Sequence, residues 1–159
     1  MKTYLIDGNN VLRADKTWNK LFLEEPERAK DLLIQKVVDF LRDKNNRAII
    51  FFDGFNFVHS HTKISKNVEI KHAKNKTADE TILITIEKQT NKKNLIIVSN
   101  DLELRSKAKL YQCQIKSSED FIKELNKSKN LSEKIDKPDL TNDDIKYWLK
   151  IFGGDDSNK

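Results

Sequence analysis

Three short apolar runs, each followed closely by an aspartate, constrain the fold of this chain more than any other feature. The runs cover residues 4–6, 48–52 and 95–98, and the aspartates that follow them are Asp7, Asp53 and Asp101. Because the carboxyl ends of parallel strands share one edge of a sheet, we expect these carboxylates to gather at that edge. Carboxylates that lie close together repel one another unless a cation holds them. The pattern therefore predicts a divalent-metal site.

Strand-like and helix-like segments alternate along the chain, which predicts a three-layer α/β/α domain with a central, mostly parallel sheet. Strands are expected at 3–6, 48–52, 95–98 and 111–115, with a loop or small hairpin over 55–77. Helices are expected at 26–43, 78–88, 102–109 and 119–127. The segment 78–88 could also be a strand, because its isoleucines alternate. We predict a helix because Thr77 and Glu80 have the spacing of a capping box. We take residues 1–127 as the main domain and 128–159 as a polar linker and carboxyl-terminal helix that docks on or extends the same domain.

Composition narrows the class of protein. The chain has 159 residues, a net charge of +5 and no apolar run as long as a membrane span. Its amino terminus lacks the long apolar core of a signal peptide. A single cysteine, Cys113, excludes an intrachain disulfide framework and suits a reducing cytosol. We therefore expect a cytoplasmic protein without membrane contact, and we expect Cys113 to be a small buried side chain.

Each acidic motif also has an ordinary structural explanation. Asp7-Gly8-Asn9-Asn10 has the composition of a tight turn, and Asp53-Gly54 taken alone is a weaker signal still. Asp79 and Glu80, in the first turn of a helix, would complement the helix dipole, and Ser99-Asn100-Asp101 would cap the next helix. The occurrence of all four motifs at one edge of one sheet favours a common site over four unrelated explanations.

The same four motifs carry a resemblance to a known family. Residues 4–11 (YLIDGNNV), 51–54 (FFDG), 77–80 (TADE) and 98–101 (VSND) together resemble the NYN domain, in particular its YacP-like branch. That family belongs to the PIN-like nuclease group, and the resemblance spans roughly residues 3–125. It implies a PIN-like sheet with acidic residues around Mg²⁺ or Mn²⁺, one ion or two, and cleavage of RNA phosphodiester bonds by metal-activated water.

The resemblance also implies roles for individual residues. Asp7, Asp79 and Asp101 correspond to metal ligands, and Asp53 to a fourth ligand or a residue behind them. Asn10, Ser99 and Glu80 would support these carboxylates. Glu103 stands where some relatives carry another acid. Mg²⁺ suits such a site because it prefers carboxylate and water oxygens.

A lysine-rich segment lies between the second and third acidic motifs. Residues 59–76 contain five lysines and one acid, which gives this segment a charge of +4. Lysines bind phosphate and aromatic rings stack on unpaired bases, although a lysine run is often only a solvated loop. The candidate RNA-binding residues are Lys63, Lys66, Lys71, Lys74, Lys76, Phe55, Phe57 and, on the helix after Asp101, Lys107.

Three functions remain open at this point. The leading hypothesis is a metal-dependent endoribonuclease of a bacterial cytosol, acting on mRNA, free or ribosome-bound, or on a structured RNA. The alternative is an RNA-binding module of the same fold that does not cut. A metal-dependent phosphatase for a small phosphoester ranks last, because it gives the lysine-rich segment no role.

Overall fold

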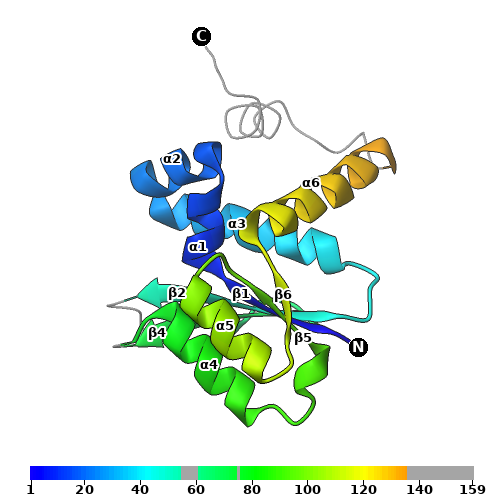
Figure 1. Cartoon of the computed structure of the whole chain (residues 1–159). Coiled ribbons are helices and arrows are strands. Elements are labelled where there is room, and N and C mark those ends of the chain that lie inside the picture. The colour runs from blue at the N-terminus through cyan, green and yellow to red at the C-terminus, as the bar shows by residue number, and fades with distance from the viewer. Residues whose placement is uncertain (55–60, 75, 136–159) are drawn as a thin grey trace.

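A computed structural model describes residues 1–54, 61–74 and 76–135, which form a sheet of six strands between two layers of helices (Figure 1). The strands are β1 (Thr3–Asp7), β2 (Arg47–Gly54), β3 (His61–Lys63), β4 (Val68–Lys74), β5 (Leu95–Val98) and β6 (Gln114–Lys116). The helices are α1 (Gly8–Ala14), α2 (Lys16–Glu24), α3 (Pro26–Leu41), α4 (Ala78–Lys88), the 3₁₀ turn η1 (Lys92–Asn94), α5 (Leu102–Leu110) and α6 (Ser118–Ile135).

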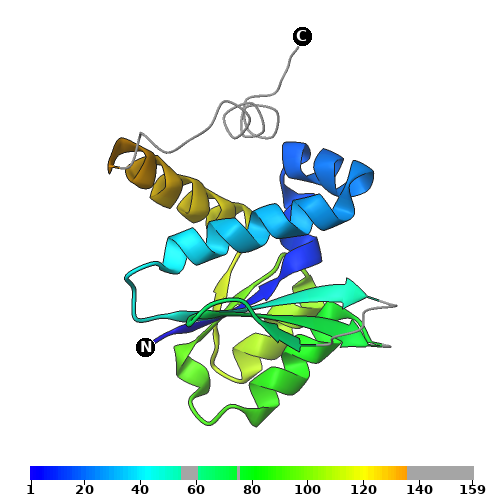
Figure 2. The ribbon, with the colours of Figure 1, turned by 180° about the vertical axis from the view of Figure 1, so that it is seen from behind.

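The sheet has the order β3-β4-β2-β1-β5-β6. Its strands pair in parallel except β3, which runs antiparallel to β4 at the edge. Helices α1, α2, α3 and α6 cover one face, and α4 and α5 cover the other, as the two opposite views show (Figures 1 and 2). The predicted three-layer α/β/α architecture with a mostly parallel sheet is therefore confirmed.

Burial on both faces explains why the central strands are apolar without a break. In β1, Tyr4 and Ile6 belong to the core under α3 and α6, whereas Leu5 belongs to the core over α4 and α5. Successive side chains of a strand point to opposite faces, so a strand covered on both sides needs apolar residues at every position.

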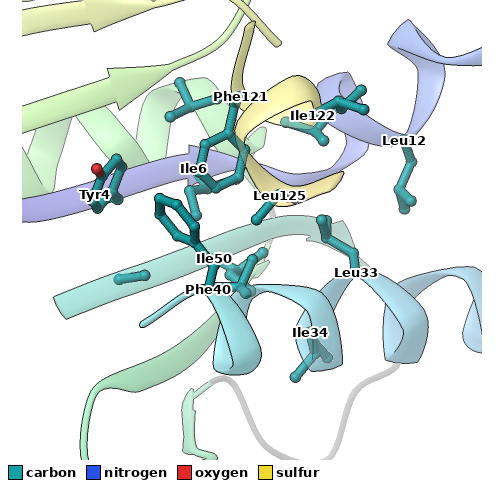
Figure 3. Packing of buried hydrophobic residues seen from close by; sticks show 14 of the residues in the cluster. Tyr4, Ile6, Leu12, Leu33, Ile34, Phe40, Ile50, Phe121, Ile122 and Leu125 are labelled. Atoms are coloured by element: carbon teal, nitrogen blue, oxygen red, sulfur yellow. The ribbon is translucent and has the colours of Figure 1, made fainter. Parts of the chain in front are cut away.

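Three aromatic rings join β1 to the helices of the larger core. The ring centroids of Tyr4, Phe40 and Phe121 lie 5.7–5.8 Å apart (Figure 3). The ring of Phe40 packs edge to face against each of the other two rings. Edge-to-face packing is a favoured arrangement of aromatic rings. The cluster fixes α3 and α6 against the strand that ends at Asp7.

Gly8 is required where β1 turns directly into α1. A Cβ atom added at this position would lie 2.4 Å from Cε1 of Phe52 and 3.0 Å from the carbonyl oxygen of Phe51. Because Phe52 is fully buried, its ring has no space into which to move. Glycine therefore allows α1 to approach β2 closely.

Several predicted boundaries are wrong. The strand expected over 111–115 begins three residues later and is β6 (Gln114–Lys116). Residues 111–113 form a turn instead, because their backbone N–H groups donate to the carbonyls of Ala108 and Lys109. Cys113 is buried, as expected. Helices α1 and α2 were not predicted, and α6 continues to Ile135, beyond the expected end at 127. The expected carboxyl-terminal helix lies outside the described residues.

Two expectations for the connecting segments are confirmed. Residues 61–74 contain the small hairpin β3-β4, and α4 is a helix with a complete capping box at Thr77 and Glu80. None of the helices in the described ranges is long and apolar enough to cross a bilayer.

Candidate metal and RNA site

The four aspartates lie along the carboxyl edge of the sheet. Asp7 is the last residue of β1, Asp53 is the penultimate residue of β2, and Asp101 follows β5 and caps α5. Asp79 lies in the first turn of α4. Because β1 pairs in parallel with both β2 and β5, these strands end on the same side of the molecule, as the apolar runs predicted.

Asp7 occupies the most buried position of the four. Only 8% of the residue is exposed, and its two carboxylate oxygens accept hydrogen bonds from the Asn10 N–H at 3.4 Å and the Ser99 hydroxyl at 3.2 Å. Burial raises the pKa of Asp7 to about 6, and the negative charges of Asp53 and Asp79 add to this rise, while the two hydrogen bonds oppose it. The raised pKa indicates a carboxylate whose negative charge is poorly compensated.

Asp53 connects β2 to the start of α4. Its Oδ1 accepts a hydrogen bond from the N–H of Ala78 at 2.6 Å, and its own N–H donates to Oδ1 of Asn9 at 2.9 Å. An anion at a helix amino terminus is stabilised by the free N–H groups and the helix dipole. Asp53 therefore holds the turn of α4 that carries Asp79.

Ser99 connects Asp7 to Asp101. Its hydroxyl donates to Asp7 and accepts the N–H of Asp101 at 3.1 Å, and the residue is completely buried. Oδ1 of Asp101 accepts the N–H of Leu104 at 2.9 Å, which caps α5. One buried hydroxyl thus contacts both the carboxylate of Asp7 and the backbone of Asp101.

Asn10 belongs to a network that sequence reasoning largely missed. Its Oδ1 accepts the N–H of Asn100 at 3.0 Å and the hydroxyl of Ser118 at 2.7 Å. Oδ1 of Asn100 accepts the N–H of Ser118, and its amide nitrogen donates to both carboxylate oxygens of Glu119. The network joins α1, the loop after β5 and the start of α6, and so fixes the rim of the acidic edge. The amide-rich motifs at 9–10 and 99–101 were the signal that was available in the sequence.

The two glutamates among the candidate residues have partners of their own. Glu80 binds the backbone N–H and the hydroxyl of Thr77, and these hydrogen bonds lower its pKa. Glu103 lies on an exposed turn of α5, with its carboxylate 3.8 Å from the Lys107 ammonium. The structure thus places Glu80 in a helix cap and Glu103 in a surface ion pair with another candidate residue.

The β3-β4 hairpin separates the lysines of the 59–76 segment. Lys63 of β3 lies opposite Glu69 of β4 in the strand register, and Lys66 lies in the turn between these strands. Both positions are near the start of β2, at the amino edge of the sheet. Lys74 pairs in register with Gly54, and Lys76 precedes α4, at the carboxyl edge. Lys71 lies between them. Phe55 and Phe57 lie outside the described residues.

The oxygen ligands at this edge suit a hard, hydrated cation. Among the described residues, no three His, Cys, Asp or Glu side chains converge closely enough to enclose a metal. Asp53 and Asp101 each direct one oxygen to a helix N–H. Mg²⁺ usually keeps several water ligands and needs only one or two carboxylates. The carboxylates and amides at the edge therefore fit a partly hydrated Mg²⁺ or Mn²⁺ and do not form an all-protein cage.

Comparisons with known proteins agree with this fold. A family model described as the YacP-like NYN domain matches residues 4–149. The crystal structure of Rae1 (YacP) from Bacillus subtilis is similar, with a TM-score of 0.72, 23% identity, and coverage of 94% of this chain and 87% of that chain. A point mutant of Rae1 gives a TM-score of 0.70 at 26% identity, over 84% and 80% of the two chains. No protein of curated function was found to match in sequence.

Proposed function

The chain belongs to the family of YacP-like NYN domains, a PIN-like nuclease family, and we propose on this premise that it is an endoribonuclease dependent on Mg²⁺ or Mn²⁺. The observation that carries the proposal is the buried carboxylate of Asp7, which lies within the electrostatic influence of Asp53 and Asp79. Keeping an anion buried next to two others costs free energy, and a bound cation would offset that cost.

Each acidic residue has a distinct proposed role. Asp7, Asp79 and Asp101 would hold the cation, directly or through its water ligands, and Asp53 would position Asp79 through the start of α4. A divalent cation held at this edge would supply a bound water of lowered pKa and would stabilise charge on the phosphate oxygens. Ser99 and Asn10 would keep Asp7 and the Asp101 loop in place during the reaction.

The proposed substrate is RNA, either an mRNA, free or on a ribosome, or a structured RNA. The family membership favours a nucleic-acid substrate. The net charge of +5 favours an anionic partner in general. We propose a cytoplasmic setting, in which RNA and Mg²⁺ are both present.

One observation favours the alternative of a non-cleaving RNA-binding module. Asp53 and Asp101 both accept hydrogen bonds at helix amino termini, so both would be useful to the fold without a metal. In this alternative the acidic edge is structural and only the basic residues meet RNA.

A cleavage assay distinguishes the two functions. Wild-type protein is incubated with end-labelled single-stranded RNA, hairpin RNA, DNA of the same sequences and a ribosome-bound message, in Mg²⁺, Mn²⁺ or EDTA. We expect metal-dependent cuts in at least one RNA and none in EDTA. Cleavage that persists in EDTA would contradict the metal-dependent mechanism, and RNA binding without any cleavage would establish the alternative.

A further inference from the structure

A basic groove separates α4 from β4 on the face of the sheet covered by α4 and α5. The cavity measures about 320 Å³ and is lined by Lys71 of β4, Lys76 and one side of α4. On α4 the lining includes Thr81, Thr85 and Lys88, which follow one another at helical spacing on one surface. We call this feature the α4 groove.

The residues that line the α4 groove carry a net positive charge. The lining contains three lysines and no aspartate or glutamate. Within the described part of the chain, none of these lysines forms an ion pair at salt-bridge distance, although the charge of Lys76 acts on Glu80. Glu87, next to Lys88 in sequence, accepts a hydrogen bond from the hydroxyl of Tyr111. The groove therefore presents cationic side chains that are available to an anion.

A larger cavity at the amino edge of the sheet provides a contrast. It measures about 630 Å³ and is also lined by basic residues, but Asp43 is among them. Its two arginines are paired, Arg42 with Asp39 at 2.7 Å and Arg47 with Glu69 at 2.5 Å. Much of its charge is thus neutralised within the protein, and it lies at the opposite edge of the sheet from Asp7.

The α4 groove runs along one side of α4, the helix that carries Asp79, and Asp79 itself is not among the residues that line it. Asp79 is in the first turn of α4 and Lys88 is its last residue. At a rise of about 1.5 Å per residue, these positions are separated by about 13 Å along the helix axis. The groove is therefore long enough to contact more than one phosphate of a single strand that lies along α4.

We propose that the α4 groove binds the phosphodiester backbone of the RNA strand next to the cut site, with Lys88 as the contact farthest from the carboxylates. This inference rests on the proposed function for the identity of the strand, and it adds Lys88 to the lysines predicted from the sequence. Lysine contacts to phosphate are independent of base sequence. The groove thus supplies affinity and register, and not base specificity.

The test compares charge reversal inside and outside the groove. Lys88→Glu is matched with Lys93→Glu, which makes the same change in charge at an exposed position of η1. Binding of a labelled 20-nucleotide single-stranded RNA is measured by fluorescence anisotropy in EDTA at several salt concentrations. We expect Lys88→Glu to raise Kd at least tenfold and to reduce the salt slope by about one phosphate contact, and Lys93→Glu to change Kd less than twofold.

Two further measurements keep the result unambiguous. Lys88→Gln, which removes the charge without reversing it, must show the same reduced salt slope, and circular dichroism checks that each variant is folded. Equal Kd values for Lys88→Glu, Lys88→Gln and wild type would overturn the inference, even if the wild type cleaves RNA. Weakened binding by the Lys88 variants, in a wild type that never cleaves, would support the groove and overturn the proposed nuclease function.

Discussion

Asp7→Asn and Asp101→Asn are each expected to lower the rate of RNA cleavage by on the order of 100-fold or more. Asparagine has nearly the same shape as aspartate, and its side-chain oxygen can still accept the N–H of Asn10 at position 7 or of Leu104 at position 101. At position 7 its NH2 group would donate to the Ser99 hydroxyl oxygen, so that this hydrogen bond is kept with its direction reversed. It lacks the negative charge that a divalent cation requires of its ligands. The measurement is the single-turnover cleavage rate in saturating Mn²⁺, with the same RNA for every protein.

Binding and a matched substitution complete this experiment. RNA affinity in EDTA should change little in either variant, because the basic residues that meet phosphate are untouched. Asp39→Asn is the control, since Asp39 of α3 forms an exposed ion pair with Arg42, just after the end of that helix, and such pairs contribute little. Cleavage by Asp7→Asn at the wild-type rate would rule out Asp7 as part of a metal site.

Asp7→Asn is also expected to stabilise the metal-free protein at neutral pH. Folding raises the pKa of Asp7 from 3.8 to about 6, because the carboxylate is buried near Asp53 and Asp79. Each pKa unit corresponds to 1.36 kcal/mol, so ionised Asp7 lowers the free energy of unfolding by up to about 3 kcal/mol above pH 6. Neutral asparagine removes this cost. The free energy of unfolding is measured by urea titration in EDTA between pH 4 and 8.

The stability difference between Asp7→Asn and wild type should depend on pH. Well below pH 3.8 the carboxyl of Asp7 is protonated in both the folded and the unfolded protein, so the advantage of Asp7→Asn should shrink as the pH falls toward 4 and disappear below it. The advantage should grow as the pH rises from about 4 to about 6, between the two pKa values, and level off above pH 6, where ionisation is complete in both states. A variant less stable than wild type at pH 7.5 would mean that Asp7 stabilises the fold and would contradict the electrostatic account of the site.

The sequence was sufficient to place the aspartates, because their positions depend only on strand direction. Once β1, β2 and β5 are parallel, Asp7, Asp53 and Asp101 must emerge at one edge, whatever the exact strand boundaries. The helical assignment of α4 was also accessible, since the Thr77 and Glu80 capping pair is local in sequence. These predictions needed no knowledge of how distant segments pack.

Features that depend on long-range contacts were not accessible in the same way. The network of Asn10, Asn100 and Ser118 joins residues that are 90 and 108 positions apart, and no local pattern pairs them. The lysines of the 59–76 segment looked continuous in sequence, but the register of β3 and β4 places Lys66 and Lys74 at opposite edges of the sheet. The groove at Lys88 appears only when α4 is packed against β4.

The central claim is that the carboxyl-edge aspartates bind a divalent cation, and a Mn²⁺ titration tests it most directly. Free Mn²⁺ is followed by electron paramagnetic resonance at pH 7.5 as it is added to wild type and to Asp7→Asn. We predict saturable uptake of one or two ions by wild type and a large loss of that uptake in Asp7→Asn. Equal uptake by the two proteins, or no uptake by wild type, would contradict the account.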